Sequence, residues 1–150
     1  MTDLDSLHRV MKNLQREMDK IQGASLKGVL RGAVVIRRSM DFDPPLVPVD
    51  TGNLRQSWFV TDSTGGTQAM SKADSSVVAT ATAMAKAATH GIKDSFLVIM
   101  GFSANYAAFV HEKVGAHFQR PGAGAKFFEA SIKRNAHRVL ELIKEEARIK

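Results

Sequence analysis

Two histidines and one glutamate lie within a short stretch, at His111, Glu112 and His117, and are side chains of the kind that bind zinc. A zinc helix of the HExxH type has histidines four residues apart, so that adjacent turns present both to one ion. Here His117 follows His111 by six positions, and Gly115 and Ala116 predict a flexible connection between them. We therefore interpret both histidines as surface or interface side chains and expect no metal site.

A glycine-rich segment lies at residues 120–126 (RPGAGAK). The phosphate-binding loop requires the spacing GxxxxGK[ST] after a strand, and this segment has neither. We expect instead a tight loop that leads into the last helix. The chain also has no GxSxG or SxxK motif, and it has no cysteine, which excludes disulfides, thiolate metal ligands and a thiol nucleophile. We expect a protein without enzymatic activity and without a cofactor.

The chain is basic: 21 Lys and Arg against 15 Asp and Glu give a net charge of +6. Positive charge favours polyanionic neighbours. The basic residues are mostly dispersed, however, and no RRM, zinc-finger or helix-turn-helix pattern is present. Contact with the phosphate backbone stays open, so a basic DNA-associated accessory protein is one interpretation. The longest strongly apolar run, residues 96–100, is far below the ~18 residues of a membrane span, and we expect no membrane partner.

The turn after the first helical region has its own side-chain chemistry. Asp50 can accept backbone N–H groups two residues on, and Thr51 can do so more weakly. Gly52 permits a positive φ, and Leu54 can anchor the turn to the core. Arg55 is a long cation beside an acid, and it could clamp either this loop or a neighbouring subunit. An ordinary connection between helix and strand explains the turn equally well.

A second group of residues, around 106–112, admits both an interface and a core interpretation. Tyr106 and Phe109 are candidate interface side chains, and packing in the core of their own domain is the other interpretation for both of them and for Val110. Glu112 and Arg120 form a candidate ion pair.

Three short blocks, in this order, give the chain a family resemblance. Residues 48–57 (PVDTGNLRQS) resemble the PxDTGxLRxS block of tailed-bacteriophage neck and tail-completion proteins, the minor virion components that join head to tail. Residues 106–112 (YAAFVHE) resemble the YAxxVxE block of that family, and residues 120–130 (RPGAGAKFFEA) are similar to its closing loop and helix entry. The resemblance spans about residues 25–140.

The resemblance implies a structural virion protein that forms a ring around the DNA channel at the junction of portal and tail. Subunits would meet through the Asp50–Arg55 and Tyr106–Arg120 loops. The implied partners are further copies of the chain, as a hexamer or alternatively a dodecamer, connector or head-closure proteins, tail proteins and, non-specifically, packaged DNA. The implied location is the virion neck or tail, after assembly in the host cytoplasm.

The elements that position these blocks follow from hydrophobic periodicity. Apolar residues at three- and four-residue spacing predict an N-terminal helix within 1–23, ending at Gly23, a second helix over 25–40, and a long C-terminal helix from Phe128 to Ala147. The sequence predicts strands over residues 57–61 and 96–102. We expect the second strand to be central in the sheet or covered on both faces. We expect one α+β domain over 1–150: a small antiparallel sheet flanked by the N-terminal helices and the long C-terminal helix.

Residues 62–94 form an insertion rich in small side chains: twenty of the 33 are Ala, Ser, Thr or Gly, which limits the apolar area they can bury. We expect a mobile loop over 62–72. Asp74 can cap a helix that starts at Ser75 and ends near His90, with a strand over 76–82 as the alternative.

Overall fold

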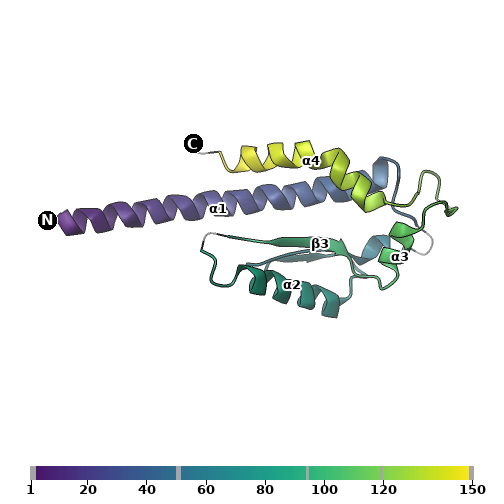
Figure 1. The fold of residues 1–150 in the computed structure, drawn as a ribbon, viewed down its shortest axis with the longest axis horizontal. Coiled ribbons are helices and arrows are strands. Elements are labelled where there is room, and N and C mark those ends of the chain that lie inside the picture. The colour runs from purple at the N-terminus through teal and green to yellow at the C-terminus, as the bar shows by residue number, and fades with distance from the viewer. Residues whose placement is uncertain (1–2, 50–51, 94, 119, 149–150) are drawn as a thin grey trace.

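The computed structural model describes residues 3–49, 52–93, 95–118 and 120–148. In these ranges the elements are α1 (Asp3–Phe42), the 3-10 turn η1 (Arg55–Ser57), β1 (Trp58–Asp62), β2 (Thr67–Ala69), α2 (Ser75–Thr89), β3 (Val98–Phe102), α3 (Ala107–Glu112) and α4 (Phe127–Glu146). The architecture is α+β, as the periodicity predicts (Figure 1).

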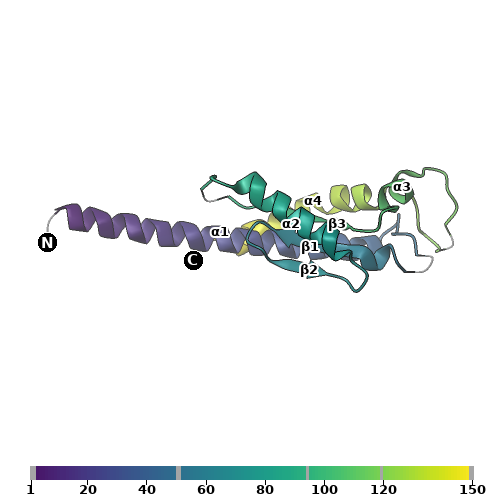
Figure 2. The same cartoon turned by 90° about the horizontal axis from the view of Figure 1, so that it is seen from below.

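The three strands form one antiparallel sheet in the order β2-β1-β3 (Figure 2). In Figure 1 the sheet lies between α2 on one face and α1 with α4 on the other. Trp58 and Val60 face α1 and join its Ala33, Ile36 and Met40 in the main core. Phe59 faces the opposite way and packs on α2. The strand predicted over residues 57–61 is therefore present, and its side chains alternate between two covered faces.

One helix replaces the two that we predict at the N-terminus: α1 runs without a break from Asp3 to Phe42, so the stop at Gly23 is wrong. A Cβ at Gly23 would meet nothing within 4 Å, so this glycine has no packing role, and its helical cost of about 1 kcal/mol is not enough to end the helix. The helix ends at Phe42, close to the predicted end at residue 40, because Pro44 and Pro45 follow and proline cannot continue a helix.

Gly28 and Gly32 have a packing role, because they let α4 approach α1 closely. A Cβ at Gly28 would lie 2.7 Å from the backbone Cα of Ile143, and one at Gly32 would lie 2.7 Å from a methyl carbon of Val139. Ser131 Oγ also donates to the carbonyl of Ile36 at 2.7 Å. The two helices thus pack against each other with their backbones close together.

The first part of the small-residue insertion is a hairpin, so the mobile loop predicted over 62–72 is wrong. Asp62 Oδ1 accepts from the backbone N–H groups of Thr64 and Gly66 and holds the turn. The strand β2 then pairs with β1, and Lys72 N donates to the carbonyl of Gln56 at 3.0 Å. Backbone pairing orders this segment, which a count of its apolar side chains does not reveal.

The helix predicted in the insertion and the second predicted strand are both present, but the strand lies at an edge of the sheet. Asp74 caps α2 by accepting from the N–H groups of Ser76 and Val77, and the strand alternative over 76–82 is excluded. The strand β3 is apolar on both faces because both are covered, by the main core and by α2. It lies at an edge of the described sheet, however, and is not central.

Candidate interaction site at the loop end

The three sequence blocks meet at one end of the molecule, which we call the loop end: residues 43–49, 52–57, 103–118 and 120–126. Backbone hydrogen bonds join them, from Leu46 N to the carbonyl of Gly122 at 2.8 Å and from Lys126 N to the carbonyl of His111 at 2.7 Å. A cavity of about 390 Å³ lies between the first block and α3, and its lining includes Pro48, Gly52, Asn53, Leu54, Tyr106 and Val110. Segments more than fifty residues apart in sequence thus form one surface.

A cluster of three arginines around Asp41 ties the loop end to α1. Arg37 Nη1 donates to Asp41 Oδ2 at 2.9 Å from one turn earlier in α1. Arg55 Nη2 donates to the same oxygen at 3.1 Å, and its Nε lies 3.0 Å from Oδ1 without hydrogen-bond geometry. Arg120 Nη1 lies 3.8 Å from Asp41 Oδ1, while its two terminal nitrogens donate to the carbonyls of Val47 and Asp41.

The Asp41 cluster bears on two predictions: the ion pair between Glu112 and Arg120, and the clamp formed by Arg55. The predicted ion pair between Glu112 and Arg120 is wrong, because Arg120 points to α1 and Glu112 binds Lys126 instead. Arg55 does clamp its own loop, but its described partner is Asp41. The sequence signal that could reveal Asp41 is its position one helical turn after Arg37, a spacing typical of ion pairs.

The predicted turn residues are partly described. Asp50 and Thr51 lie outside the described residues. Gly52 has φ +81°, which confirms the predicted left-handed conformation, and Leu54 is buried in the main core as the expected anchor. The glycine-rich segment is the predicted loop into α4, with Gly122 at φ +83°.

Most of the block at 106–112 forms a short helix, α3 (Ala107–Glu112), which is not among the elements predicted from the sequence. Val110 packs against the main core. Phe109 is 67% exposed, so the core interpretation is wrong for this residue, and Tyr106 is also exposed. Val114, just after α3, is 78% exposed. The loop end therefore presents large apolar side chains to its surroundings.

Charged side chains link α3 to the start of α4. Lys126 binds Glu112, and this ammonium group lowers the pKa of the Glu112 carboxyl and has its own pKa raised. Lys126 has a left-handed backbone (φ 61°), which is uncommon for a residue other than glycine. His111 Nε2 accepts from the N–H of Glu129 at 3.3 Å, so Nδ1 carries the proton and donates to Glu112 at 2.9 Å.

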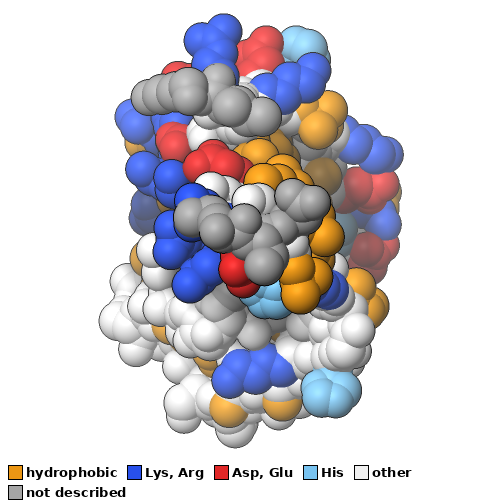
Figure 3. Space-filling model, turned by 90° about the vertical axis from the view of Figure 1, so that its left-hand side faces the viewer, with side chains coloured by type: hydrophobic (Ala, Val, Ile, Leu, Met, Phe, Trp, Pro, Cys, Tyr) orange, Lys and Arg blue, Asp and Glu red, His pale blue; other side chains and the backbone are white. Residues whose placement is uncertain are grey.

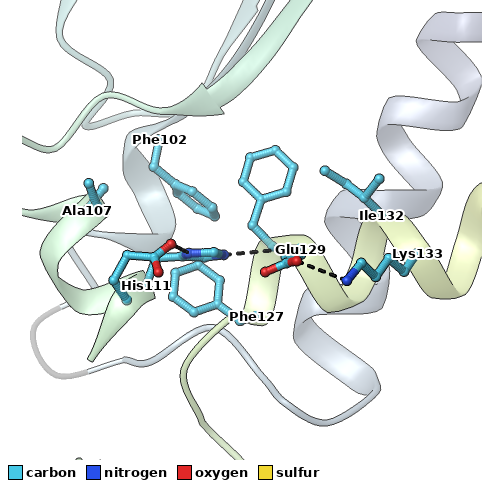
Figure 4. Close-up of a pocket in the computed structure, with 10 residues that line it drawn as sticks. Phe102, Ala107, His111, Phe127, Glu129, Ile132 and Lys133 are labelled. Carbon is cyan, nitrogen blue, oxygen red and sulfur yellow. Dashed lines mark hydrogen bonds and ion pairs between the residues drawn. The ribbon is translucent and has the colours of Figure 1, made fainter. Parts of the chain in front are cut away.

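An apolar pocket of about 460 Å³ opens beside these ion pairs (Figure 4). The rings of Phe102, His111 and Phe127 form its wall, with His111 edge-on to Phe127 at 5.0 Å between ring centroids. Glu129 and Lys133 bind each other at its rim. Such a pocket fits an apolar side chain flanked by polar groups.

The geometry gives no support to metal chemistry. Both nitrogens of His111 have protein partners, and no group of three potential ligands gathers anywhere in the described ranges. No helix among the described residues is long and apolar enough to span a bilayer. Comparison with protein-family models, curated proteins and solved structures found no match.

Proposed function

We propose that this chain is a structural virion protein of a tailed bacteriophage, which forms a ring at the neck and joins head to tail around the DNA channel. The supporting observation is that three blocks with the family resemblance, scattered over residues 48–130, lie together at the loop end. Asp41 binds Arg55 of the first block and lies near Arg120 of the third. The backbone N–H of Lys126 joins the third block to His111 of the second, so the three blocks form one surface.

The subunit contact in this proposal uses the apolar side chains of the loop end. Phe109 and Val114 are exposed on or just after α3, and the apolar pocket opens between α3 and α4. An aromatic side chain that enters a desolvated pocket is the usual kind of anchor in a protein interface. The net charge of +6 suits a ring that surrounds DNA, because positive charge attracts the phosphates of the DNA in the channel.

Negative-stain microscopy of the purified chain, alone and with heads and tails of the phage that encodes it, tests the proposal through particle mass and symmetry. We expect rings of six or twelve copies. Phe109→Asp should abolish them, whereas Met84→Asp, an equally exposed apolar position on α2, should not. A chain that stays monomeric with both partners present would contradict the proposal.

The basic composition keeps one alternative, a DNA-associated accessory protein without catalytic activity. Salt distinguishes the two, because binding through phosphate contacts weakens steeply as salt rises and a ring held by apolar contacts does not. DNA binding that falls with a steep salt slope, without any ring, would favour the alternative.

A further inference from the structure

The first half of α1 projects beyond the body of the molecule with an apolar stripe in the open. Figures 1 and 2 both show this half of the helix extending past the sheet and α4. Six side chains of the stripe are 36–69% exposed: Leu4, Leu7, Met11, Leu14, Met18 and Ile21. No other described segment covers them along the full stripe.

These six residues follow a seven-residue repeat. Their spacings are three, four, three, four and three, which is the a and d pattern of a coiled coil, carried over two and a half heptads. A helix that packs on a broad globular core has a wider apolar face, with further apolar residues at e or g. We call these six residues the seam; Val10 lies beside it and the other neighbours are polar.

The seam continues a face that is already an interface farther along α1. Met18 and Ile21 border a pocket with Phe96, and Gln22 donates to the carbonyl of Ser95 at 3.0 Å. About two and three turns later, Gly28 and Gly32 lie against α4. The same side of the helix is thus covered by this chain's own elements from about residue 22 onward and is uncovered before it.

The charged residues beside the seam favour the same helix of a second copy as the partner that covers the seam. Between Asp3 and Gln22 the chain has four acidic residues and four basic ones, so this half of α1 has no net charge. In Figure 3, hydrophobic side chains gather on one side of the centre of this view, and Lys and Arg lie on both sides of the molecule with Asp and Glu among them. An anionic lipid surface or DNA would select a basic helix, whereas mixed signs are compatible with self-pairing.

The flanking positions meet no electrostatic obstacle in such a pair. The e positions are His8, Gln15 and Gln22, none of which is an acidic residue or a Lys or Arg, and Val10 and Glu17 occupy g positions. Neither a parallel nor an antiparallel pair therefore places two like charges directly across the seam.

We propose that the seam pairs with the same seam of a second copy of this chain, as a short coiled coil. The pairing covers the apolar side chains that the body leaves exposed and stabilises a helical half that has few tertiary contacts of its own. It uses the opposite end of α1 from the loop end, so it stands whether or not the chain is a neck protein.

Sedimentation of the full chain without any partner tests the pairing, over about 1–100 µM, the range in which micromolar association is measured. We expect assemblies of two or more chains. Leu7→Asp with Leu14→Asp should weaken association about 100-fold or more, the scale of interface hot spots. Ser6→Asp with Asn13→Asp adds the same charges one residue away, outside the seam, and should change it about twofold or less.

Two further measurements keep the result decisive. Fluorescence of Trp58, the single tryptophan, reports whether the body stays folded in both variants, as expected from its distance to the seam. Phe109→Asp should leave seam association unchanged, which separates it from any ring contact at the loop end. A wild-type chain that is monomeric over this range, or a control pair as dissociated as the seam pair, would overturn the proposal.

Discussion

Replacing Asp41 by asparagine keeps the size of the side chain and removes the charge that holds three arginines together. The side chain of Asp41 is only 13% exposed, and that of Arg37 is 12% exposed. Asparagine can accept at one position but cannot neutralise the cations. We therefore expect the contact between the loop end and α1 to weaken, at a measurable cost in the free energy of unfolding.

The size of this cost follows from the three contacts. A hydrogen bond to a charged group contributes about 1.5–3 kcal/mol. For the largely buried pair of Arg37 and Asp41 we take the middle of that range. Arg55 is 43% exposed, so its share falls towards the value of about 1 kcal/mol for exposed pairs, and the 3.8 Å contact of Arg120 adds less. The sum is about 3 kcal/mol, which at about 2–4 °C per kcal/mol lowers Tm by about 6–12 °C.

Thermal unfolding followed by circular dichroism, with Asp43→Asn as the matched control, measures this difference. Asp43 is two residues away and 59% exposed, and its ion pair with Arg134 spans 3.9 Å, so its replacement should cost no more than about 1 kcal/mol. Equal Tm values for the two variants would show that the charge of Asp41 adds no stability beyond that of an exposed carboxylate, and the reasoning about Asp41 would be refuted.

Two more predictions concern packing and pH. Gly28→Ala should destabilise the fold by about 1–3 kcal/mol, because its Cβ would collide with the backbone of Ile143, whereas Gly23→Ala, with open space around it, should stabilise by about 0.4–1 kcal/mol; urea unfolding of both variants checks the opposite signs. The ion pair with Lys126 lowers the pKa of Glu112, so its stabilisation is complete above the ordinary value of 4.5 and is lost as pH falls through the lower folded-state pKa. The difference in Tm between wild type and Glu112→Gln should therefore be present at neutral pH and shrink on acidification; a difference independent of pH would refute this origin.

Local patterns were sufficient for most of the elements. The 3.6-residue period of α4 and the alternation of β1 are properties of contiguous residues, and the cap of α2 needs only Asp74 and the two residues after Ser75. The helix α3 was not predicted because its six residues are too few to establish a period. The hairpin over 62–72 was not predicted because its order comes from hydrogen bonds to β1 and not from its own side chains.

The candidate site was predictable by residue but not by partner. Arg55 and Arg120 stand out in the sequence, yet the carboxylate that both approach is Asp41, which is 79 positions from Arg120. The same is true of Glu112, whose partner Lys126 comes into reach only because the loop end folds back onto α3. Spacing identifies side chains capable of pairing, and tertiary contacts decide the pairs.

The helix α1 connects the two proposed contact surfaces, the seam and the loop end, and its length decides whether one surface can affect the other. The Asp41 cluster fixes the loop end to the last turn of α1. The close contacts of Gly28 and Gly32 with α4 fix the middle of α1. Twenty residues of α1 separate Ile21, the last seam residue, from Asp41, which at 1.5 Å per residue is about 30 Å, too far for direct coupling between the seam and the loop end. Pairing at the seam therefore leaves the loop end free for a different neighbour, and copies joined in pairs at one end can still meet others at the opposite end.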